Sequence, residues 1–477
     1  MIIKLGSATN AGQEKLVLFW KNEIPSEIKN SVEKEIKNDK LSFSKEIDGL
    51  STYFCGLKSF DQKGTSAEKA RIAGFNLNRM LNADKLGSIQ IESHLDREIS
   101  LAFAEGLALS NYQFLKYFKD ADKRQNSLRE ANLVNAQVTE EDISRLNASI
   151  YATYEARSLV NEPLSYLTAE QLSAEIERLG KDSGFHVEVF NKKKIEILKM
   201  GGLLAVNRGS IEPPTFNILS YKPNNPVNKK PYVLVGKGVV YDTGGLSLKP
   251  TANSMDFMKC DMGGAAAVIG TMAAIAKAEL NVHVICLVPA TENRPGGNAY
   301  APGDVVPMFN GLNVEVLNTD AEGRMILADA LAYAIKYDPE LVFDFATLTG
   351  AAARAIGGEG VVAMGTAEDA EFDLLVESGY KTYERIALFP FWDEYGEQIK
   401  SDIADIKNLG GPEAGMITAG KFLEHFTKKD DKHAYPWIHV DIAGPAYNFK
   451  PKHYQGVQGA GTGTRLLFDF FCKKADA

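Results

Sequence analysis

The sequence predicts an α/β protein in which a smaller N-terminal α/β domain, residues 1–150, precedes a larger C-terminal α/β domain, residues 151–477. The first observation is the length of 477 residues, which exceeds what one hydrophobic core usually organises. The second is a composition of 45% hydrophobic and 24% charged residues, as in ordinary globular proteins. The third is the alternation of short apolar strands with helical segments in the C-terminal part, which predicts a central, largely parallel mixed sheet flanked by helices.

The first third of the chain alternates between element types. Residues 15–20 and 87–93 are predicted strands, residues 26–38 a charged surface helix and residues 100–118 a long helix with an apolar face. A further helix over 145–163 ends at a proline. We expect this last helix to connect the two domains.

The C-terminal part contains five short apolar segments that are predicted strands: residues 186–190, 232–238, 283–290, 314–317 and 341–348. Predicted helices at 263–279 and 325–337 lie between them. In parallel sheets of this kind, sites form outside the carboxyl ends of the strands. The chemistry is therefore expected in the loops that follow these strands.

Bulk properties exclude several classes of protein. The formal net charge of -9 argues against a nucleic-acid partner. No apolar run approaches the roughly 20 residues of a membrane span, and the N-terminus lacks the apolar stretch of a secretion signal. The 4 cysteines form no CxxC pair, so neither a disulfide framework nor a thiolate zinc site is predicted. We expect a cytoplasmic protein.

A glycine-rich stretch after one predicted strand is dense in charged residues. It contains Lys237, Asp242, Lys249, Asp256 and Asp261 among glycines that allow tight turns. A phosphate cradle is one interpretation, but neither GxxxxGKS nor GxxxxGKT is present. A loop with solvated charges remains the alternative to a metal site.

The stretch "NTDAEGR" places Asp320, Glu322 and Arg324 just before a predicted helix. Helix capping is the simple explanation, because acidic groups suit the positive end of the helix dipole. The spacing of two residues would also put both carboxylates on one side of an extended segment. If they converge with Asp242 and Asp261, four like charges cannot all remain ionised unaided. Two divalent cations would neutralise them.

The motifs "VGKGVVYDTGG", "KCDMGGAA" and "NTDAEGR" resemble the signature of the leucine aminopeptidase family, the cytosolic dinuclear-metal aminopeptidases. The resemblance continues through "ARSLVNEP", "MGGLLAVNRGS", "SDIADIKN" and "HVDIAGPA", and so covers most of the chain from about residue 155 onward. The first third shows no motif of its own. The resemblance implies that the C-terminal domain is catalytic.

The resemblance implies a metal-ligand set of Lys237, Asp242, Asp261, Asp320 and Glu322. Asp242 and Glu322 would bridge two divalent ions, zinc or manganese with magnesium or cobalt as further options, and the Asp320 carbonyl would be an added ligand. A lysine can ligate only as a neutral amine, a state that nearby dications favour. Lys249 and Arg324 match the two catalytic cations, and Arg324 would hold a bicarbonate ion.

The resemblance also implies a substrate pocket formed by Met258, Asn318, Ala321, Thr347, Leu348 and Gly350. Small or apolar side chains suit a peptide whose N-terminal residue is leucine or methionine, with broad specificity. The implied activity is removal of N-terminal residues by a water that two metals activate, in intracellular peptide turnover. Family members assemble as homohexamers, dimers of trimers, and we expect the same assembly.

Alternative functions are a dinuclear phosphoesterase, a DNA-binding accessory protein and a catalytically inactive structural assembly. The loop between Lys249 and Asp261 is one residue longer than the family pattern, which leaves Asp256 as a weak competitor to Asp261. Cys260 is expected to be a buried small residue. HExxH is absent, and His439 is expected to be a packed strand histidine without a catalytic role.

Overall fold

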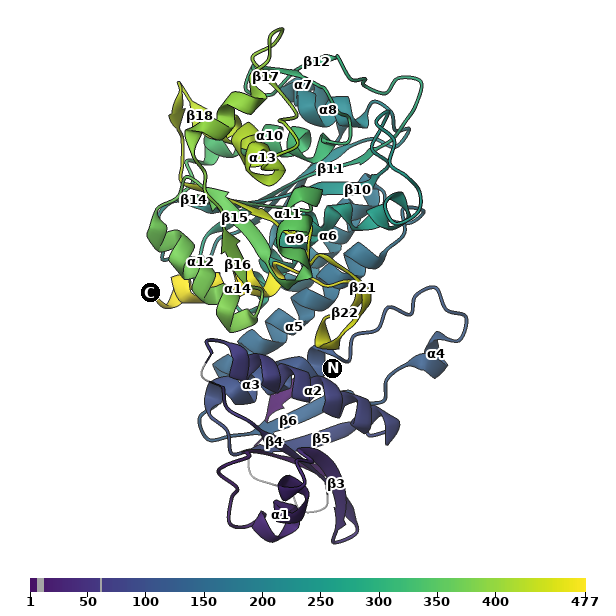
Figure 1. Ribbon diagram of the computed structural model, residues 1–477, viewed down its shortest axis with the longest axis vertical. Helices are drawn as coiled ribbons and strands as arrows, with labels where there is room; N and C mark the ends of the chain where they lie inside the picture. Colours follow the sequence, from purple (N-terminus) through teal and green to yellow (C-terminus); the bar gives the residue numbers. More distant parts are fainter. Residues whose placement is uncertain (7–12, 61) are drawn as a thin grey trace. The chain divides into compact units, whose positions relative to one another are not determined.

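The computed structural model describes residues 1–6, 13–60 and 62–477, which form two compact units (Figure 1). The first unit comprises Met1–Tyr154 with the short segments Tyr380–Tyr383 and Lys450–Gly456. The second comprises Glu155–Gly379, Glu384–Phe449 and Val457–Ala477. Each unit combines a sheet with helices, which confirms the predicted α/β class.

The first unit is built on a six-stranded sheet with the order β1-β6-β5-β2-β4-β3. Its strands are β1 (Ile2–Leu5), β2 (Lys15–Trp20), β3 (Ser42–Ile47), β4 (Leu50–Leu57), β5 (Ser88–Ser93) and β6 (Glu130–Val134). Only the β3–β4 pair is antiparallel among the described strands of this sheet. The associated helices are α1 (Lys29–Lys37), α2 (Thr65–Ala83), α3 (Arg97–Leu109) and α4 (Ala121–Arg124). Helix α5 (Glu140–Asn161) begins in this unit, and its residues from Glu155 onward belong to the second unit.

Alternating side chains of β2 face two different cores. Leu16 and Leu18 pack with residues of α2 and α3. Val17 and Phe19 pack with residues of α1 on the other face. Successive strand residues point to opposite faces, so a continuous apolar strand such as "KLVLFW" is expected where helices cover both sides. The predicted strands 15–20 and 87–93 are confirmed as β2 and β5, and the predicted helix 26–38 as α1.

The helix predicted over 100–118 is wrong beyond Leu109, where α3 ends. The next apolar residues belong to an irregular segment. The Asn111 side chain donates to the Leu128 carbonyl at 2.8 Å and accepts from the amides of Asn78 and Asn82, each at 3.2 Å. These bonds hold the Asn111 side chain against α2 and against the segment that precedes β6. Helical periodicity alone could not reveal these partners.

The second unit contains a nine-stranded sheet with the order β16-β15-β20-β14-β9-β11-β8-β7, and β10 pairs with β11. Its strands are β7 (His186–Phe190), β8 (Thr215–Tyr221), β9 (Tyr232–Gly236), β10 (Gly238–Asp242), β11 (Val284–Asn293), β14 (Leu341–Ala346), β15 (Val361–Gly365), β16 (Ile386–Leu388) and β20 (Trp437–Asp441). The pairs linking β20, β14, β9, β11 and β10 are parallel. A largely parallel mixed sheet is therefore confirmed.

The remaining helices that the structure describes are α6 (Ala169–Ser183), α7 (Lys192–Leu198), α8 (Gly201–Asn207), α9 (Gly263–Lys277), α10 (Glu322–Ala334), α11 (Gly350–Ile356), α12 (Asp369–Thr382), α13 (Gly415–Glu424) and α14 (Thr464–Asp476). Val233 and Val235 of β9 join a core with residues of α8, α10 and α13. On the opposite face, Phe343 of β14 packs edge-on against Phe470 of α14, with ring centroids 5.1 Å apart. Helices therefore cover both faces of the sheet (Figure 1).

The segment predicted as a strand at 314–317 is only partly extended and does not belong to the large sheet. It overlaps β13 (Asn313–Glu315), which pairs with β12 (Val305–Pro307) and β17 (Ile406–Lys407). The remaining short strands are β18 (Lys428–Lys429), β19 (Lys432–His433), β21 (Tyr447–Lys452) and β22 (Gly456–Gly459). The apolar residues of 314–317 indicate correctly that the segment packs against a core, which Val314 and Val316 join. They do not indicate which sheet the strand belongs to.

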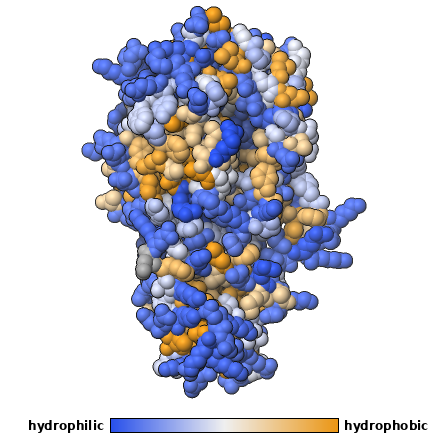
Figure 2. Space-filling model, in the orientation of Figure 1, coloured by the Kyte–Doolittle hydropathy of each residue, from blue (hydrophilic) through white to orange (hydrophobic). Residues whose placement is uncertain are grey.

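The face of the molecule drawn in Figure 2 is mostly hydrophilic, with apolar side chains gathered in patches. Such a surface is ordinary for a globular protein, because polar side chains cannot cover it completely. None of the helices in the described ranges combines the length with the apolar character that a membrane span needs.

Helix α10 is fixed to its surroundings by a buried acid. Asp329 is fully buried and accepts hydrogen bonds from the backbone N–H groups of Leu203, at 2.9 Å, and Phe309, at 3.0 Å. Leu203 lies in α8, and Phe309 precedes β13. Every residue of α10 is buried, so this helix is central to the unit. Through its two hydrogen bonds, the Asp329 carboxylate holds two neighbouring segments against that helix.

We predict that Asp329→Ala lowers the free energy of unfolding by about 2 to 4 kcal/mol, because two buried N–H groups lose their acceptor. Urea denaturation measures this loss. Asp182→Ala is the control, since the Asp182 side chain is 49% exposed and pairs at the surface with Arg178. A loss for Asp329→Ala no larger than the control's would contradict the role assigned to this carboxylate.

Candidate metal centre

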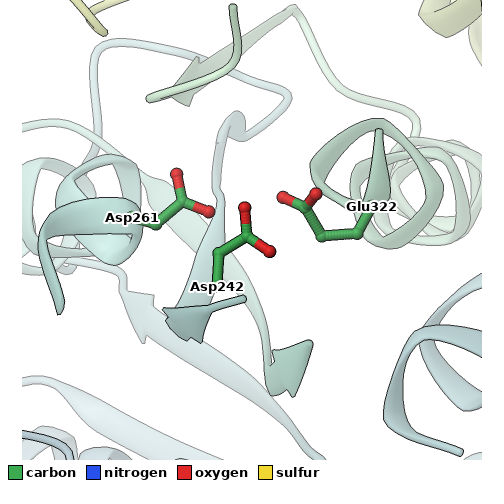
Figure 3. Close-up of side chains that lie close together, drawn as sticks. All are labelled: Asp242, Asp261 and Glu322. Carbon is green, nitrogen blue, oxygen red and sulfur yellow. The ribbon is translucent and has the colours of Figure 1, made fainter. Parts of the chain in front are cut away.

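Three buried carboxylates converge where strands and helices of the second unit meet. Asp242 ends β10, Asp261 lies near the end of the 3₁₀ helix η1 (Met255–Met262), and Glu322 is the first residue of α10. One ligand oxygen from each lies within 4.8 Å of the others. Figure 3 shows the three carboxyl groups directed toward one another. The convergence predicted for these three residues is therefore present.

Two glycine positions make this convergence possible. Gly244 has φ +84, a conformation that glycine adopts without strain, and its N–H donates to Asp242 Oδ1 at 2.8 Å. The chain can therefore turn directly after Asp242. At Gly323, an added Cβ would lie 2.7 Å from the Lys237 ammonium nitrogen. Glycine at that position leaves the space that the lysine side chain occupies.

Lys237 lies between two of the acids. Its Nζ is 2.8 Å from Asp261 Oδ1 and 2.9 Å from Glu322 Oε1, and it donates to the Thr347 carbonyl at 2.9 Å. Burial acts to lower the pKa of Lys237, but Asp261 and Glu322 outweigh that effect and raise it. In the absence of a metal, this ammonium group is the counter-ion of the two carboxylates.

Lys249 links a second pair of acids. Its Nζ is 2.9 Å from Asp242 Oδ2 and 2.6 Å from Asp320 Oδ1. The Asp320 side chain is 32% exposed and lies outside the three-carboxylate cluster, to which Lys249 connects it. The centre therefore has a deep half around Lys237 and a more open half around Lys249.

The four carboxylates are only partly compensated by the two ammonium groups. Burial raises the pKa of Asp242 to about 7, and the neighbouring Glu322 carboxylate acts in the same direction. Burial also raises the pKa of Asp261 well above its ordinary value, although Lys237 opposes this. Burial opposes ionisation of Glu322 too, but the charges of Lys237 and Lys249 lower its pKa.

The donor set fits divalent cations. Asp261 Oδ2 and Glu322 Oε2 are buried and have no hydrogen-bond partner within the described part of the chain. Carboxylate oxygens are suitable ligands for manganese, magnesium and zinc, and a buried carboxylate needs a cation or a donor. Unpaired oxygens inside an acidic cluster are what a metal site without its ions would present.

Arg324 lies one helical position beyond Gly323 in the first turn of α10 and is buried. Its Nη1 donates to the Asn408 carbonyl at 2.8 Å, while its Nε has no hydrogen-bond partner among the residues described. Burial lowers the pKa of Arg324 to about 10, so the side chain remains a cation near neutral pH. The guanidinium group therefore keeps a donor available close to the acids.

The predicted substrate residues lie on the same segments as these charged groups. Thr347 Oγ1 donates to Asp261 Oδ1 at 2.9 Å, and Asn318 Oδ1 accepts from the Asp320 N–H at 2.8 Å. The other predicted residues are Met258 in η1, Ala321 at the start of α10, Leu348 after β14 and Gly350 at the start of α11. All six residues therefore lie on three segments of the chain. The first carries Asp261, the second carries Asp320, and the third contains Thr347, whose carbonyl accepts a hydrogen bond from Lys237.

Some sequence arguments need correction. Asp320 and Glu322 do not share an extended segment, because Asp320 lies in a turn and Glu322 already belongs to α10. Asp256 is exposed and accepts from the Ser254 N–H, outside the acidic cluster. Cys260 is buried, as expected.

His439 is a packed strand histidine, as expected, and it also pairs with a buried acid. It is fully buried in β20, and its Nδ1 lies 2.7 Å from Asp344 Oδ1 on the neighbouring strand β14. Trp437 Nε1 donates to the other Asp344 oxygen at 2.8 Å. The buried aspartate therefore joins two residues of β20, which fixes the register of this strand pair.

One contact of the acidic centre was not predicted from the sequence. The Asn293 side chain donates to Asp242 Oδ1 at 2.8 Å. The available signal was a polar residue shortly after the predicted strand 283–290, next to the strand that carries Asp242. Without knowledge of that strand order, nothing distinguishes this asparagine from a loop residue.

Comparison with known proteins gives a consistent result. Residues 154–468 match the profile described as the cytosol aminopeptidase family, catalytic domain. A probable cytosol aminopeptidase of Chlorobium limicola is 45% identical over 387 residues, 79% of this chain and 75% of the relative. One from Chlorobium phaeobacteroides is 41% identical over 434 residues, 87% of this chain and 83% of the relative.

A solved structure is similar over nearly the whole chain. It is described as the bottromycin maturation enzyme BotP in complex with Mn, and it shares 28% sequence identity with a TM-score of 0.85. The match covers 98% of this chain and 100% of that one. The similarity therefore includes the N-terminal part, where the sequence shows no motif.

We predict that Lys237→Met destabilises the metal-free protein by about 3 to 5 kcal/mol, because two buried carboxylates lose their counter-ion. Urea unfolding in the presence of a chelator measures the change. Lys230→Met is the control: its partner Asp338 is also 2.9 Å away, but both side chains are more than half exposed, at 54% and 73%. Equal losses for the two variants would show that the buried lysine is not required for charge balance.

Proposed function

Since this chain belongs to the cytosol aminopeptidase family, we propose that its buried carboxylates hold two divalent metal ions with which it releases N-terminal residues from peptides. Membership makes the protein an aminopeptidase, a metal-dependent hydrolase. The observation that carries the proposal is the convergence of Asp242, Asp261 and Glu322 within 4.8 Å, with carboxylate oxygens that lack a donor.

The two ammonium groups support two metal positions. Lys237 pairs with Asp261 and Glu322, and Lys249 pairs with Asp242 and Asp320. Each ammonium group faces two carboxylates, so further positive charge is needed in both halves of the centre. The residues that would hold the ions are Lys237, Asp242, Asp261, Asp320 and Glu322. Manganese is supported by the BotP structure, which is described as a complex with Mn. Zinc, magnesium and cobalt are the alternatives with suitable ligand chemistry.

The residues of the centre have distinct roles in the proposed mechanism. When bound, a pair of divalent ions would lower the pKa of a water molecule and polarise the carbonyl group of the peptide bond to be cleaved. Lys237 would give up its proton to act as a neutral ligand, as metal binding requires of such groups. Lys249 keeps its charge and is held between Asp242 and Asp320, where it would stabilise the negative charge that develops on the carbonyl oxygen.

Arg324 is proposed to bind a bicarbonate ion, which would supply a general base for the attacking water. The support is physical: the side chain is buried and cationic, and its Nε has no hydrogen-bond partner within the described residues. An anion at this position would receive that donor. It would also lie close to the first turn of α10, where the helix dipole favours negative charge.

Selection of the N-terminal residue is proposed for Met258, Asn318, Ala321, Thr347, Leu348 and Gly350. The hydrogen bond from Thr347 to Asp261 places the segment that continues to Gly350 beside a proposed metal ligand. Leucine and methionine side chains suit these small and apolar residues. Discrimination should be modest, because one methylene is worth about 1 to 3 kcal/mol. We propose a role in cytoplasmic peptide turnover and a homohexamer arranged as a dimer of trimers.

The first test measures hydrolysis of a leucyl amide before chelation, after chelation, and after manganese or zinc is added back. We predict that chelation abolishes activity, that added metal restores it, and that Asp320→Ala fails to recover because one half of the centre loses a ligand. Bound metal is measured in each sample. A fully active, metal-free protein would contradict the proposal.

We also predict that Lys249→Met lowers kcat by about 100-fold to 1000-fold while KM changes little, because the lost charge acts on the transition state. Steady-state kinetics at saturating manganese measure the effect. Lys230→Met, a surface substitution in the same unit, should leave both constants unchanged. A normal kcat for Lys249→Met would show that Lys249 does not stabilise the negative charge on the carbonyl oxygen. The proposed metal centre would not be affected by that result.

A further inference from the structure

Asn293 connects two parts of the acidic centre through a single amide group. It is the last residue of β11, it lies next to Asp242 in the parallel β10–β11 pair, and it is fully buried. Its Nδ2 donates to Asp242 Oδ1 at 2.8 Å and to the Thr319 carbonyl at 3.0 Å. Both partners are acceptors only, so the amide nitrogen must be the atom that faces them.

Thr319 extends the connection to the loop that leads to Lys249. Thr319 Oγ1 donates to the Gly244 carbonyl at 2.7 Å and accepts from the Ser247 N–H at 2.8 Å. The Thr319 N–H donates to Ser247 Oγ at 3.1 Å, and Tyr300 Oη donates to the Thr319 carbonyl at 2.9 Å. The residue before Asp320 is therefore bonded to three other segments.

We propose that Asn293 is a positioning residue for the metal centre, an inference that rests on the proposed function. Asp242 is contributed by β10, whereas Asp320 and Glu322 follow Thr319, so these ligands come from separate segments of the chain. Asn293 holds both segments with one rigid planar group. Bonds of this kind, which orient a ligand from outside the coordination sphere, strongly affect metal affinity.

The second consequence concerns the orientation of Asp242. Its Oδ1 receives hydrogen bonds from Asn293 Nδ2 and the Gly244 N–H, and its Oδ2 faces Lys249 at 2.9 Å. Two donors on one oxygen fix the rotation of the carboxyl group before any ion arrives. Asn293 thus reduces the ordering that metal binding would otherwise require.

Asn217 provides a matched control within the same sheet. It is also fully buried, and its Nδ2 donates to the Val288 carbonyl at 3.1 Å and to Thr215 Oγ1 at 3.3 Å. In both asparagines, Oδ1 has no hydrogen-bond partner in the part of the chain that the structure describes. The two side chains therefore have the same burial and similar bonding, but only Asn293 contacts a proposed metal ligand.

The experiment compares Mn²⁺ binding by chelated wild-type protein, Asn293→Leu and Asn217→Leu, using calorimetric titration without peptide. Leucine has the same branched side-chain shape as asparagine, with the same number of heavy atoms, and removes both donors. We expect Asn293→Leu to weaken Mn²⁺ binding about 10-fold to 100-fold, the usual cost of losing such a partner. Asn217→Leu should bind Mn²⁺ like wild type, even where the two variants lose similar thermal stability.

Peptidase kinetics give an independent readout. For Asn293→Leu, turnover of a leucyl amide should fall at limiting Mn²⁺ and recover largely at saturating Mn²⁺, with KM for the amide unchanged. If Asn293→Leu does not fold, Asn293→Ser carries the test, because its hydroxyl is too short to reach both acceptors. Wild-type Mn²⁺ affinity in the folded Asn293 variant would overturn the proposal.

The two proposals can fail separately. If the wild-type protein binds Mn²⁺ and Asn293→Leu binds it equally well, the positioning role is wrong and the metal centre stands. If the wild-type protein binds neither Mn²⁺ nor Zn²⁺ at the acidic cluster, the proposed metal centre is wrong, and the role of Asn293 is overturned with it.

Discussion

Carboxylates brought together in a protein interior repel one another and lose the solvation that stabilises their charge. The second unit places Asp242, Asp261 and Glu322 in this situation, and much of the surrounding structure reduces the cost. Lys237 lies between Asp261 and Glu322, and Lys249 lies between Asp242 and Asp320. Two positive charges for four acids leave a deficit that divalent ions would remove. Charge balance thus connects the stability of this region to its chemistry.

The parallel sheet explains why acids that are distant in sequence meet. Strands β9, β10, β11 and β14 run in the same direction, so the segments that follow them begin at one edge. Asp242 ends β10, Asn293 ends β11, and Thr347 follows β14. Helix α10 brings Glu322 and Arg324 to the same edge, and Asp329 anchors that helix further along its length. A rigid scaffold therefore supports a site made mostly of loop and terminal residues.

The sequence allowed prediction of the features that depend on local pattern. Alternating apolar strands and helices indicate the α/β class, and the distinctive motifs around Asp242, Asp261 and Glu322 point to one centre. Features that depend on contacts between residues far apart in the sequence could not be predicted. Helix α3 ends at Leu109, and just beyond it the Asn111 side chain bonds to residues of other elements, which helical periodicity does not reveal. Likewise, the contact of Asn293 with Asp242 requires a strand order that no local pattern contains.

Gly323 shows how a residue without a functional group can control an active centre. A methyl group at this position would lie 2.7 Å from the Lys237 nitrogen, which is closer than real Cβ contacts allow. The lysine side chain and any larger residue at 323 therefore compete for one volume. The lysine nitrogen is held by Asp261, Glu322 and the Thr347 carbonyl, so a side chain at position 323 would push it away from these three partners. A substitution at Gly323 would therefore disturb the charge balance of the centre while every charged residue is still present.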